Sequence, residues 1–457
     1  MAELIISISG VRGIVGETLG PVESTEFGMA YGTFLQQQKS GEARPRICIG
    51  RDSRPSGPML AAALGAGLMA TGCDIVDLRI VTTPGVGLMI DHLACDGGIV
   101  MTASHNPIEY NGIKFLRDDG IAYPADEIKQ IHQNYFNKTY HRVDSIGVGE
   151  GSSNSDTHAL HIRQILKICD KNLIASKHYK VVLDSINGAG CVVTADLLSE
   201  LGCELIHLND QPTGHFAHRP EPVAENLTEL GPQILQHHAA IGFVQDPDGD
   251  RLALFNEKGE FIGEEYTLAL AAKYRFSKKS GTAAANLSTS RMIDSIAEAA
   301  GGKVIRTPVG EAHVANAMKA ENCMIGGEGN GGVIDLRIGP VRNSLAAIAM
   351  ILQLMAESGK SLIELVSEIP AYSMLKTKFA CEPDQAQQAL ERVKTHYAAG
   401  DDGAKVDTRD GIRIDLPEGW VQLRASNTEP IMRLMAESSD QAATQNLIDQ
   451  VKQIAGI

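Results

Sequence analysis

The sequence lacks the features that would point to a membrane or to a nucleic acid. Its 457 residues contain no run of about 18 uncharged apolar residues, so we expect no transmembrane helix. The formal net charge of −15 argues against a nucleic-acid surface, because binding to phosphates of nucleic acids needs clustered cations. Glu3 stands where a secretory leader would carry positive charge, so we expect no leader.

Paired cysteines and nucleotide-binding patterns are also missing. The eight cysteines are scattered without a CxxC pair, and several lie inside apolar runs, as buried free thiols do. This spacing disfavours zinc and favours a reducing, cytoplasmic compartment. Neither a Walker A pattern nor a strand-coupled GxGxxG occurs, which argues against a nucleotide site.

What is present is the composition of a globular enzyme, with 43% hydrophobic and 21% charged residues. Strand-like apolar runs alternate with helical stretches up to Pro370, which predicts three mixed α/β domains of similar layout. The short strands and two helical stretches that follow predict a smaller C-terminal α+β domain. The Gly- and Ser-rich residues 147–156 are expected to form a linker. The expected domains span residues 1–150, 155–258, 259–370 and 371–457.

A first loop with reactive potential follows the strand-like residues 98–101. This serine loop, residues 102–107, reads Thr-Ala-Ser-His-Asn-Pro. Pro107 biases Asn106 toward extended geometry, which restrains the backbone around Ser104 as a reacting hydroxyl requires. By itself the pattern fits a turn that caps backbone amides at least as well. Three further loops with distinct chemistry favour the nucleophile.

The aspartate loop, residues 246–251, carries three carboxylates at alternate positions. Asp246, Asp248 and Asp250 fall on one side of an extended loop, where their repulsion calls for a cation. Oxygen ligands without His or Cys favour Mg²⁺ or Ca²⁺. An EF-hand is disfavoured because Arg251 stands where that loop needs glycine. A solvated acidic turn remains the alternative.

Two later loops suit a polar ligand. The glycine loop, residues 326–332, has five glycines, and its only side chains, Glu328 and Asn330, suit hydroxyl recognition. A flexible hinge is its alternative interpretation. The arginine loop, residues 424–430, combines a guanidinium, hydroxyls and an amide, with Arg433 close behind, as a phosphate site does. A polar turn before a strand is the alternative there.

Arginines in glycine- or serine-rich turns near the N-terminus are further candidates for phosphate contacts. They are Arg12, Arg51 and Arg54. Singly, each such arginine is more often a surface residue or part of a structural ion pair.

The four loops, in this order and spread over nearly the whole chain, resemble those of the α-D-phosphohexomutase superfamily. The serine loop is similar to the family's phosphoserine loop, and the aspartate loop to its metal loop. The glycine loop is similar to its sugar loop, and the arginine loop to its phosphate loop. The resemblance implies an α/β fold of four domains around a central cleft. Further similar segments are residues 9–13, 50–57, 83–84, 184–190 and 219–227.

The resemblance also implies a reaction. Ser104, carried as phosphoserine, would donate its phosphoryl group to a hexose phosphate, forming a hexose 1,6-bisphosphate that also serves as activator. The intermediate would turn over and return the other phosphoryl to Ser104, so that phosphate moves between the 1- and 6-positions. Mg²⁺ would offset the charge of the transferring group. Its implied ligands are Ser104, Asp246, Asp248 and Asp250.

Roles for the remaining residues follow from the same resemblance. Arg12 and Lys114 would handle protons or stabilise charge, and Lys114 would need a depressed pKa to act as a base. His105 and Arg251 would contact the transferring phosphoryl group. Sugar hydroxyls would meet Glu328 and Asn330. The implied substrate-binding residues are Glu328, Asn330, Thr307, Gly310, Arg424, Ser426, Asn427, Thr428 and Arg433.

One departure bears on the substrate. Many bacterial relatives end the sugar loop in Ser-Gly-His, whereas this chain has Asn330-Gly331-Gly332, and His313 could stand in for the missing histidine. The segment at residues 7–13 and the glycine loop resemble those of chains usually assigned as phosphoglucosamine mutases, and this resemblance implies conversion of glucosamine 6-phosphate to glucosamine 1-phosphate. Broad phosphomannomutase or phosphoglucomutase activity, a phosphatase, and a non-catalytic sugar-phosphate-binding paralogue remain alternatives. We expect a hexose-phosphate substrate, no nucleic-acid or membrane partner, and a monomer or homodimer.

Overall fold

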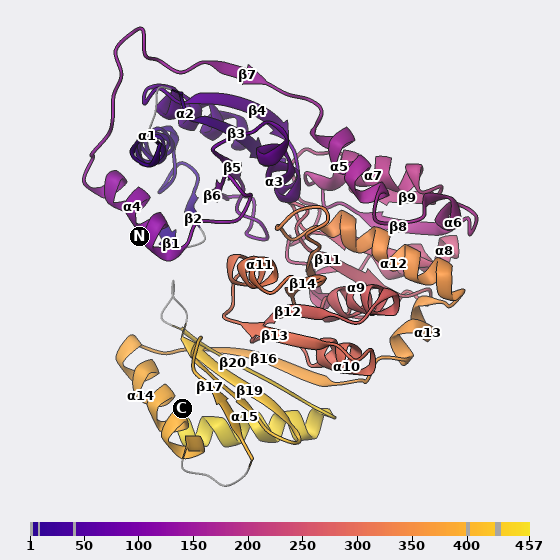
Figure 1. The fold of residues 1–457 in the computed structure, drawn as a ribbon. Coiled ribbons are helices and arrows are strands. Elements are labelled where there is room, and N and C mark those ends of the chain that lie inside the picture. The colour runs from indigo at the N-terminus through magenta and orange to yellow at the C-terminus, as the bar shows by residue number, and fades with distance from the viewer. Residues whose placement is uncertain (1–2, 8–9, 40–42, 399–402, 426–430) are drawn as a thin grey trace.

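A computed structural model describes residues 3–7, 10–39, 43–398, 403–425 and 431–457. Four sheets follow one another along the chain and are arranged round an arc, from the indigo N-terminal sheet to the yellow C-terminal one (Figure 1). The expectation of three mixed α/β units and a different C-terminal unit is confirmed.

The first sheet has seven strands in the order β1-β2-β6-β5-β3-β4-β7. Strand β3 pairs in parallel with β4 and β5, and β5 pairs antiparallel with β6. The strands are β1 Ile5–Ser7, β2 Gly10–Ile14, β3 Arg46–Arg51, β4 Asp74–Ile80, β5 Gly97–Met101, β6 Tyr110–Arg117 and β7 Gly151–Ser153. The helices are α1 Pro21–Gln38, α2 Gly57–Met69, α3 Thr83–His92 and α4 Ala125–Phe136.

The second sheet has four strands in the order β11-β10-β8-β9. Strand β8 pairs in parallel with β9 and β10, and β10 pairs antiparallel with β11. The strands are β8 Lys180–Asp184, β9 Glu204–Leu208, β10 Ile241–Gln245 and β11 Leu252–Phe255. The helices are α5 Thr157–Leu166, α6 Lys171–Ala175, α7 Gly190–Glu200 and α8 Leu230–His237, with a 3₁₀ turn at Ala224–Asn226.

The third sheet has the order β13-β12-β14-β15, with β12 parallel to β13 and β14, and β14 antiparallel to β15. The strands are β12 Thr282–Asn286, β13 Lys303–Thr307, β14 Ile325–Glu328 and β15 Gly332–Ile334. The helices are α9 Glu265–Lys278, α10 Met292–Ala299, α11 Glu311–Ala320, α12 Ser344–Ser358 and α13 Leu362–Ser367. Asn343 caps α12 at its start through the amide of Ala346, and Gly359 ends it in the left-handed region.

The fourth sheet is entirely antiparallel, in the order β16-β20-β19-β18-β17, with two helices packed on it. The strands are β16 Ser373–Ala380, β17 Lys405–Asp407, β18 Ile412–Asp415, β19 Gly419–Ala425 and β20 Ile431–Ser438. The helices are α14 Pro383–Ala398 and α15 Gln441–Ala455. The apolar positions of α15, including Leu447, Ile448 and Val451, face the sheet as their spacing predicts.

The first three sheets share one pattern: a central strand with a parallel neighbour on each side, one of which pairs with an antiparallel fourth strand. The loops that join the third strand of the pattern to the fourth are β5–β6, β10–β11 and β14–β15. The serine and aspartate loops lie in the first two connections, and the glycine loop spans the end of β14, the third connection and the start of β15. All three start at the carboxyl end of a parallel strand, the edge at which α/β sheets bind ligands.

One expectation about organisation needs correction. Part of the expected linker at residues 147–156 is strand β7, which pairs in parallel with β4 at the sheet edge. The second and third units pack closely together, because one continuous hydrophobic core runs from Ile165 to Ile369. All eight cysteines are free thiols. Among the helices of the described ranges, none is long and apolar enough to cross a membrane.

Candidate functional site

Ser104 lies buried at the centre of the molecule, with 1% of its surface exposed. Its backbone has φ +49°, which costs a residue other than glycine about 1–3 kcal/mol and must be held by its surroundings. The hydroxyl of Thr102 accepts a hydrogen bond from the Ser104 amide at 2.8 Å. The Ser104 hydroxyl donates to Asp246 Oδ2 at 3.0 Å, so the serine loop meets the aspartate loop of the next unit.

Arg54 holds the serine loop in this conformation. Its guanidinium donates to the carbonyl oxygens of Ser104, Asn106, Pro107 and Tyr110 at 2.6 to 2.9 Å. The buried carboxylate of Asp52, 3.0 Å from Arg54 Nε, neutralises the arginine charge. The proposed phosphate contact is therefore wrong for Arg54, because every terminal nitrogen is already bonded to the backbone.

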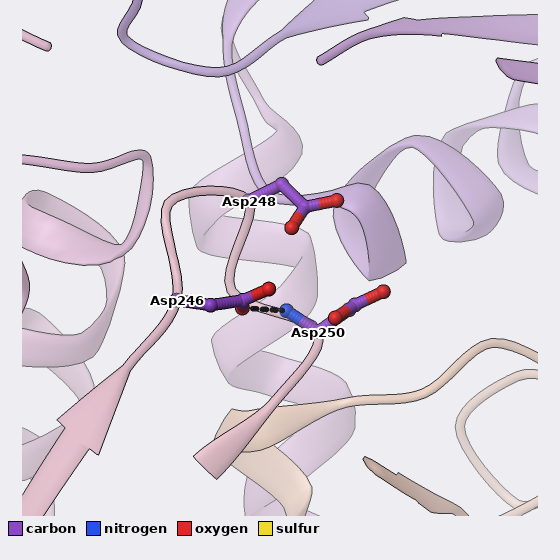
Figure 2. Close-up of side chains that lie close together, drawn as sticks. All are labelled: Asp246, Asp248 and Asp250. Carbon is purple, nitrogen blue, oxygen red and sulfur yellow. Dashed lines mark hydrogen bonds between the residues drawn. The ribbon is translucent and has the colours of Figure 1, made fainter. Parts of the chain in front are cut away.

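The aspartate loop gathers three carboxylates that extend toward the same side of the loop (Figure 2). One oxygen from each of Asp246, Asp248 and Asp250 lies within 4.8 Å of the other two, and all three residues are buried. Asp246 Oδ1 accepts from the amides of Asp250 and Arg251, both at 3.1 Å, which closes the loop on itself. Oδ1 of Asp248 and Oδ1 of Asp250 are buried without a hydrogen-bond partner. Unpaired buried carboxylate oxygens so close together fit a hard divalent cation such as Mg²⁺.

Lys114 from β6 and Thr83 from α3 bring the first unit to the same cluster. Lys114 Nζ donates to Asp248 Oδ2 at 2.7 Å, and the Thr83 hydroxyl donates to the same oxygen at 2.6 Å. Burial lowers the pKa of Lys114, but the charges of Asp248 and Asp250 outweigh burial and raise it. Lys114 is thus an ammonium suited to stabilising charge, and the depressed pKa that a base would need is absent.

The carboxylates respond unequally to this environment. Burial, followed by the charges of Asp248 and Asp250, raises the pKa of Asp246 well above its usual value. Although burial opposes it, the Lys114 charge holds the pKa of Asp248 well below the usual range. The negative charge at Asp246 therefore lacks a full counter-charge, which again fits a cation at this position.

Three further predicted residues contact the serine loop or the aspartate loop. His105 Nδ1 lies 3.4 Å from Ser104 Oγ, and Arg12 Nη1 donates to Asn106 Oδ1 at 3.1 Å. Arg251 Nε lies 3.7 Å from Asp250 Oδ1. The charge of Arg251, then burial and the charge of Arg12, lower the pKa of His105 to about 2. A neutral imidazole beside two guanidinium groups leaves positive charge where an anion would bind.

Glu328 is the best-connected residue of the glycine loop. Its Oε1 accepts from Asn286 Nδ2 at 2.8 Å and from the Gly310 amide at 3.1 Å. Asn330 Nδ2 lies 3.5 Å from Glu328 Oε2, and Asn330 Oδ1 is buried without a partner. Thr307, at the end of β13, is buried and bonds to the adjacent carbonyl of Pro308. Asn330 thus retains an acceptor for a ligand hydroxyl.

Arg342 belongs to this site, although the sequence analysis did not select it. The residue precedes α12 and is buried, with its side chain among Asp250, Glu328 and Glu311. The signal available in the sequence was an arginine in the turn Gly339-Pro340-Val341-Arg342, the same feature that marked the N-terminal candidates. His313, in contrast, is exposed on α11.

The arginine loop is described only in part. Arg424 and Arg433 face each other across β19 and β20, and Arg424 Nε lies 3.5 Å from Asp410 Oδ1. Asp410 Oδ2 also accepts from the Val309 amide at 2.9 Å, which ties this end of the fourth sheet to the residues before α11. Three predicted substrate-binding residues, Ser426, Asn427 and Thr428, lie outside the described residues.

Family models match the chain along most of its length. All four carry the description phosphoglucomutase/phosphomannomutase: alpha/beta/alpha domain I at residues 4–142, domain II at 159–259, domain III at 263–372 and the C-terminal domain at 377–454.

Individual relatives agree with the models. A phosphoglucomutase/phosphomannomutase of Thermococcus kodakarensis is 39% identical over 444 residues, covering 96% of both chains. A probable phosphoglucosamine mutase of Methanopyrus kandleri is 36% identical over 445 residues, covering 97% of this chain and 95% of the relative. The crystal structure of a phosphoglucomutase/phosphomannomutase family protein from Burkholderia thailandensis aligns with a TM-score of 0.87 at 25% identity, covering 99% of this chain and 97% of its own.

Replacing Arg54 with lysine should loosen the serine loop. Lysine keeps the positive charge for Asp52 but cannot reach four carbonyl oxygens, so we expect amide hydrogen exchange of residues 103–106 to accelerate about tenfold. Hydrogen–deuterium exchange measured by mass spectrometry tests this. Arg51→Lys is the matched control, because Arg51 pairs with Asp77 and should leave the loop protected. Unchanged exchange in Arg54→Lys would contradict the holding role.

Asp248→Asn should weaken binding of a divalent cation. The substitution removes one of three clustered charges, so we expect Mn²⁺ affinity, measured by electron paramagnetic resonance of the free ion, to fall about tenfold or more. Asp184→Asn alters a buried carboxylate outside the cluster and should leave the affinity unchanged. Equal affinities in the two variants would remove the cluster as the metal site.

Proposed function

This chain belongs to the phosphoglucomutase/phosphomannomutase family and is a phosphohexomutase, and on that premise we propose that it interconverts glucosamine 6-phosphate and glucosamine 1-phosphate. The observation that carries the proposed chemistry is the contact between the Ser104 hydroxyl and Asp246, at 3.0 Å. It brings a restrained serine to a cluster of oxygen ligands, which supports Ser104 as the residue that carries the phosphoryl group.

In the proposed reaction, a sugar hydroxyl attacks the phosphorus of phosphorylated Ser104, and the bond between phosphorus and the Ser104 oxygen breaks. The resulting hexose 1,6-bisphosphate turns over, and its other phosphoryl group returns to Ser104. Phosphoryl transfer depends on positioning and charge more than on a strong base. The raised pKa of Lys114 is compatible with this demand, because an ammonium at that place stabilises the transferring group.

Other side chains of the site would bind the two phosphates and the sugar. Arg12 and Arg251 lie close enough to the serine loop and Asp250 to orient the transferring phosphoryl group. Arg424 and Arg433, with the loop between them, would hold the phosphate that does not react. Glu328 and Asn330 would bind sugar hydroxyls in both orientations of the intermediate.

Mg²⁺ would be held by Ser104, Asp246, Asp248 and Asp250, where a divalent cation supplies charge neutralisation for phosphoryl transfer. A hexose 1,6-bisphosphate is the proposed activator, because it would phosphorylate Ser104 at the start of turnover. The eight free thiols support a reducing compartment such as the cytoplasm.

A second candidate is broad activity on mannose and glucose phosphates. The relative from Thermococcus kodakarensis, at 39% identity, is named a phosphoglucomutase/phosphomannomutase. The relative from Methanopyrus kandleri, at 36% identity, is named a probable phosphoglucosamine mutase, and it supports the first candidate. The glycine loop would decide between them by whether it reads only hydroxyls that all three sugars share.

Ser104→Ala should abolish turnover without unfolding the protein, since removing a buried hydroxyl leaves the backbone contacts of the loop in place. Intact-mass measurement should find one phosphate on the wild-type chain and none on the variant. Incubation with glucose 6-phosphate should remove that phosphate from the wild type and yield the sugar bisphosphate. Release of stoichiometric inorganic phosphate would instead indicate a phosphatase, and a fully active variant would refute the role of Ser104.

Comparison of kcat/KM for glucosamine, mannose and glucose phosphates, with Mg²⁺ and a bisphosphate activator, tests the substrate. We expect a preference of about a hundredfold for the amino sugar, roughly 2.7 kcal/mol of transition-state discrimination. Comparable values on all three sugars would overturn the first candidate in favour of the second.

A further inference from the structure

Arg342 connects the aspartate loop to the glycine loop through a single side chain. Its Nη2 donates to Asp250 Oδ2 and its Nη1 donates to Glu328 Oε2, both at 2.5 Å. Nε lies 3.0 Å from Glu311 Oε2. Each nitrogen of the guanidinium therefore faces a carboxylate from a different segment, and the residue is 8% exposed.

The two residues that follow Arg342 are bonded to the aspartate loop and to β15, next to the glycine loop. The Asn343 amide donates to the carbonyl of Val333 in β15, next to the glycine loop. The Ser344 hydroxyl donates at 2.6 Å to the carbonyl of Gly249, inside the aspartate loop. Arg342 thus has little freedom to follow one loop without the other.

The glycine loop also makes room for this side chain. A Cβ atom added at Gly332 would lie 2.2 Å from Arg342 Cδ, closer than two carbon atoms can approach without a shift. Gly332 is therefore required by the path of Arg342, independently of any need for backbone flexibility.

We propose that Arg342 is a positioning residue that couples the metal site to the sugar site, an inference that rests on the proposed function. The single positive charge is shared between Asp250, which would hold the metal, and Glu328, which would bind the sugar. A change in the strength of the hydrogen bond between Glu328 and the guanidinium therefore changes the strength of the hydrogen bond between the guanidinium and Asp250. By linkage, each site then alters the affinity of the other by the same factor.

Lysine cannot take over this role. Its ammonium is a compact point charge, whereas the planar guanidinium presents donors in a fixed fork that can serve two carboxylates at once. Arg342→Lys consequently preserves the local charge while it breaks the connection. The variant separates coupling from simple neutralisation of the buried carboxylates.

The test is a cycle of Mn²⁺ affinities, measured by electron paramagnetic resonance on the full chain without sugar. Glu328→Gln releases Arg342 toward Asp250, so it should weaken Mn²⁺ binding about fivefold, the lower end of typical coupling between sites. In the Arg342→Lys background the same substitution should change the affinity less than twofold. An equal shift in both backgrounds, or no shift in either, overturns the proposal.

Two further variants keep the result interpretable. Gly332→Ala retains Arg342 but displaces it, so it should reduce the effect of Glu328→Gln as Arg342→Lys does, even if the lysine variant folds poorly. Arg275→Lys is the control, since Arg275 is a buried arginine near Asp335 and the Met324 carbonyl, and it should preserve the fivefold effect. A control that also loses the effect contradicts a specific role.

A mutase assay of the wild type distinguishes failure of the proposed coupling from failure of the proposed function. If the wild type turns over sugar phosphate and binds Mn²⁺, but the effects of Glu328→Gln and Arg342→Lys on Mn²⁺ affinity are additive, the coupling alone is refuted. Wild-type protein that neither binds Mn²⁺ nor turns over would refute the proposed function itself.

Discussion

Repulsion among buried carboxylates is the constraint on which the centre of this protein depends. Asp246, Asp248 and Asp250 crowd one loop, and Glu328 and Glu311 lie beyond them. Such a group is costly to bury unless positive charge is brought in from elsewhere. The chain supplies that charge from other units: Lys114 comes from the first, Arg342 from the third. The need for neutralisation thus holds separate units together, and what remains unneutralised provides the place for a cation.

The repeated sheet pattern explains why distant segments meet. In each of the first three units, the connection between the third and fourth strands of the pattern carries the functional loop. A residue at the carboxyl end of the central strand supports that loop in two of them: Asp52, just after β3, binds Arg54 and Thr102, and Asn286, the last residue of β12, binds Glu328. The three functional loops therefore lie at the same position in the repeated sheet pattern, and each loop carries different side chains.

The local sequence was sufficient to predict many helices and strands and the four loops, but it could not identify the side chains that hold the loops in place. The apolar spacing of α15, for example, predicts the face that packs on the fourth sheet. Arg54 was selected for its glycine- and serine-rich surroundings, yet its partners are carbonyls some fifty residues away, which no spacing reveals. Arg342 was not selected for the same reason, since its carboxylate partners lie in other segments of the sequence. The aliphatic part of the Arg342 side chain fills the space beside Gly332, where the resemblance implies a histidine in many bacterial relatives. The glycine at this position and the arginine that packs against it belong to different segments, so neither segment alone reveals the arrangement. Strand β7 was hidden because pairing, and no apolar pattern, defines an exposed edge strand.

The continuous core shared by the second and third units has a consequence for the integrity of the chain. A covalent break at the turn near residue 258 would leave two fragments that still share part of that core. We expect such fragments to stay associated, because separating them would expose to water the part of the core that is buried between them. The middle of this molecule therefore behaves as one body regardless of chain continuity, and a protease acting there would cut the polypeptide without dismantling the protein.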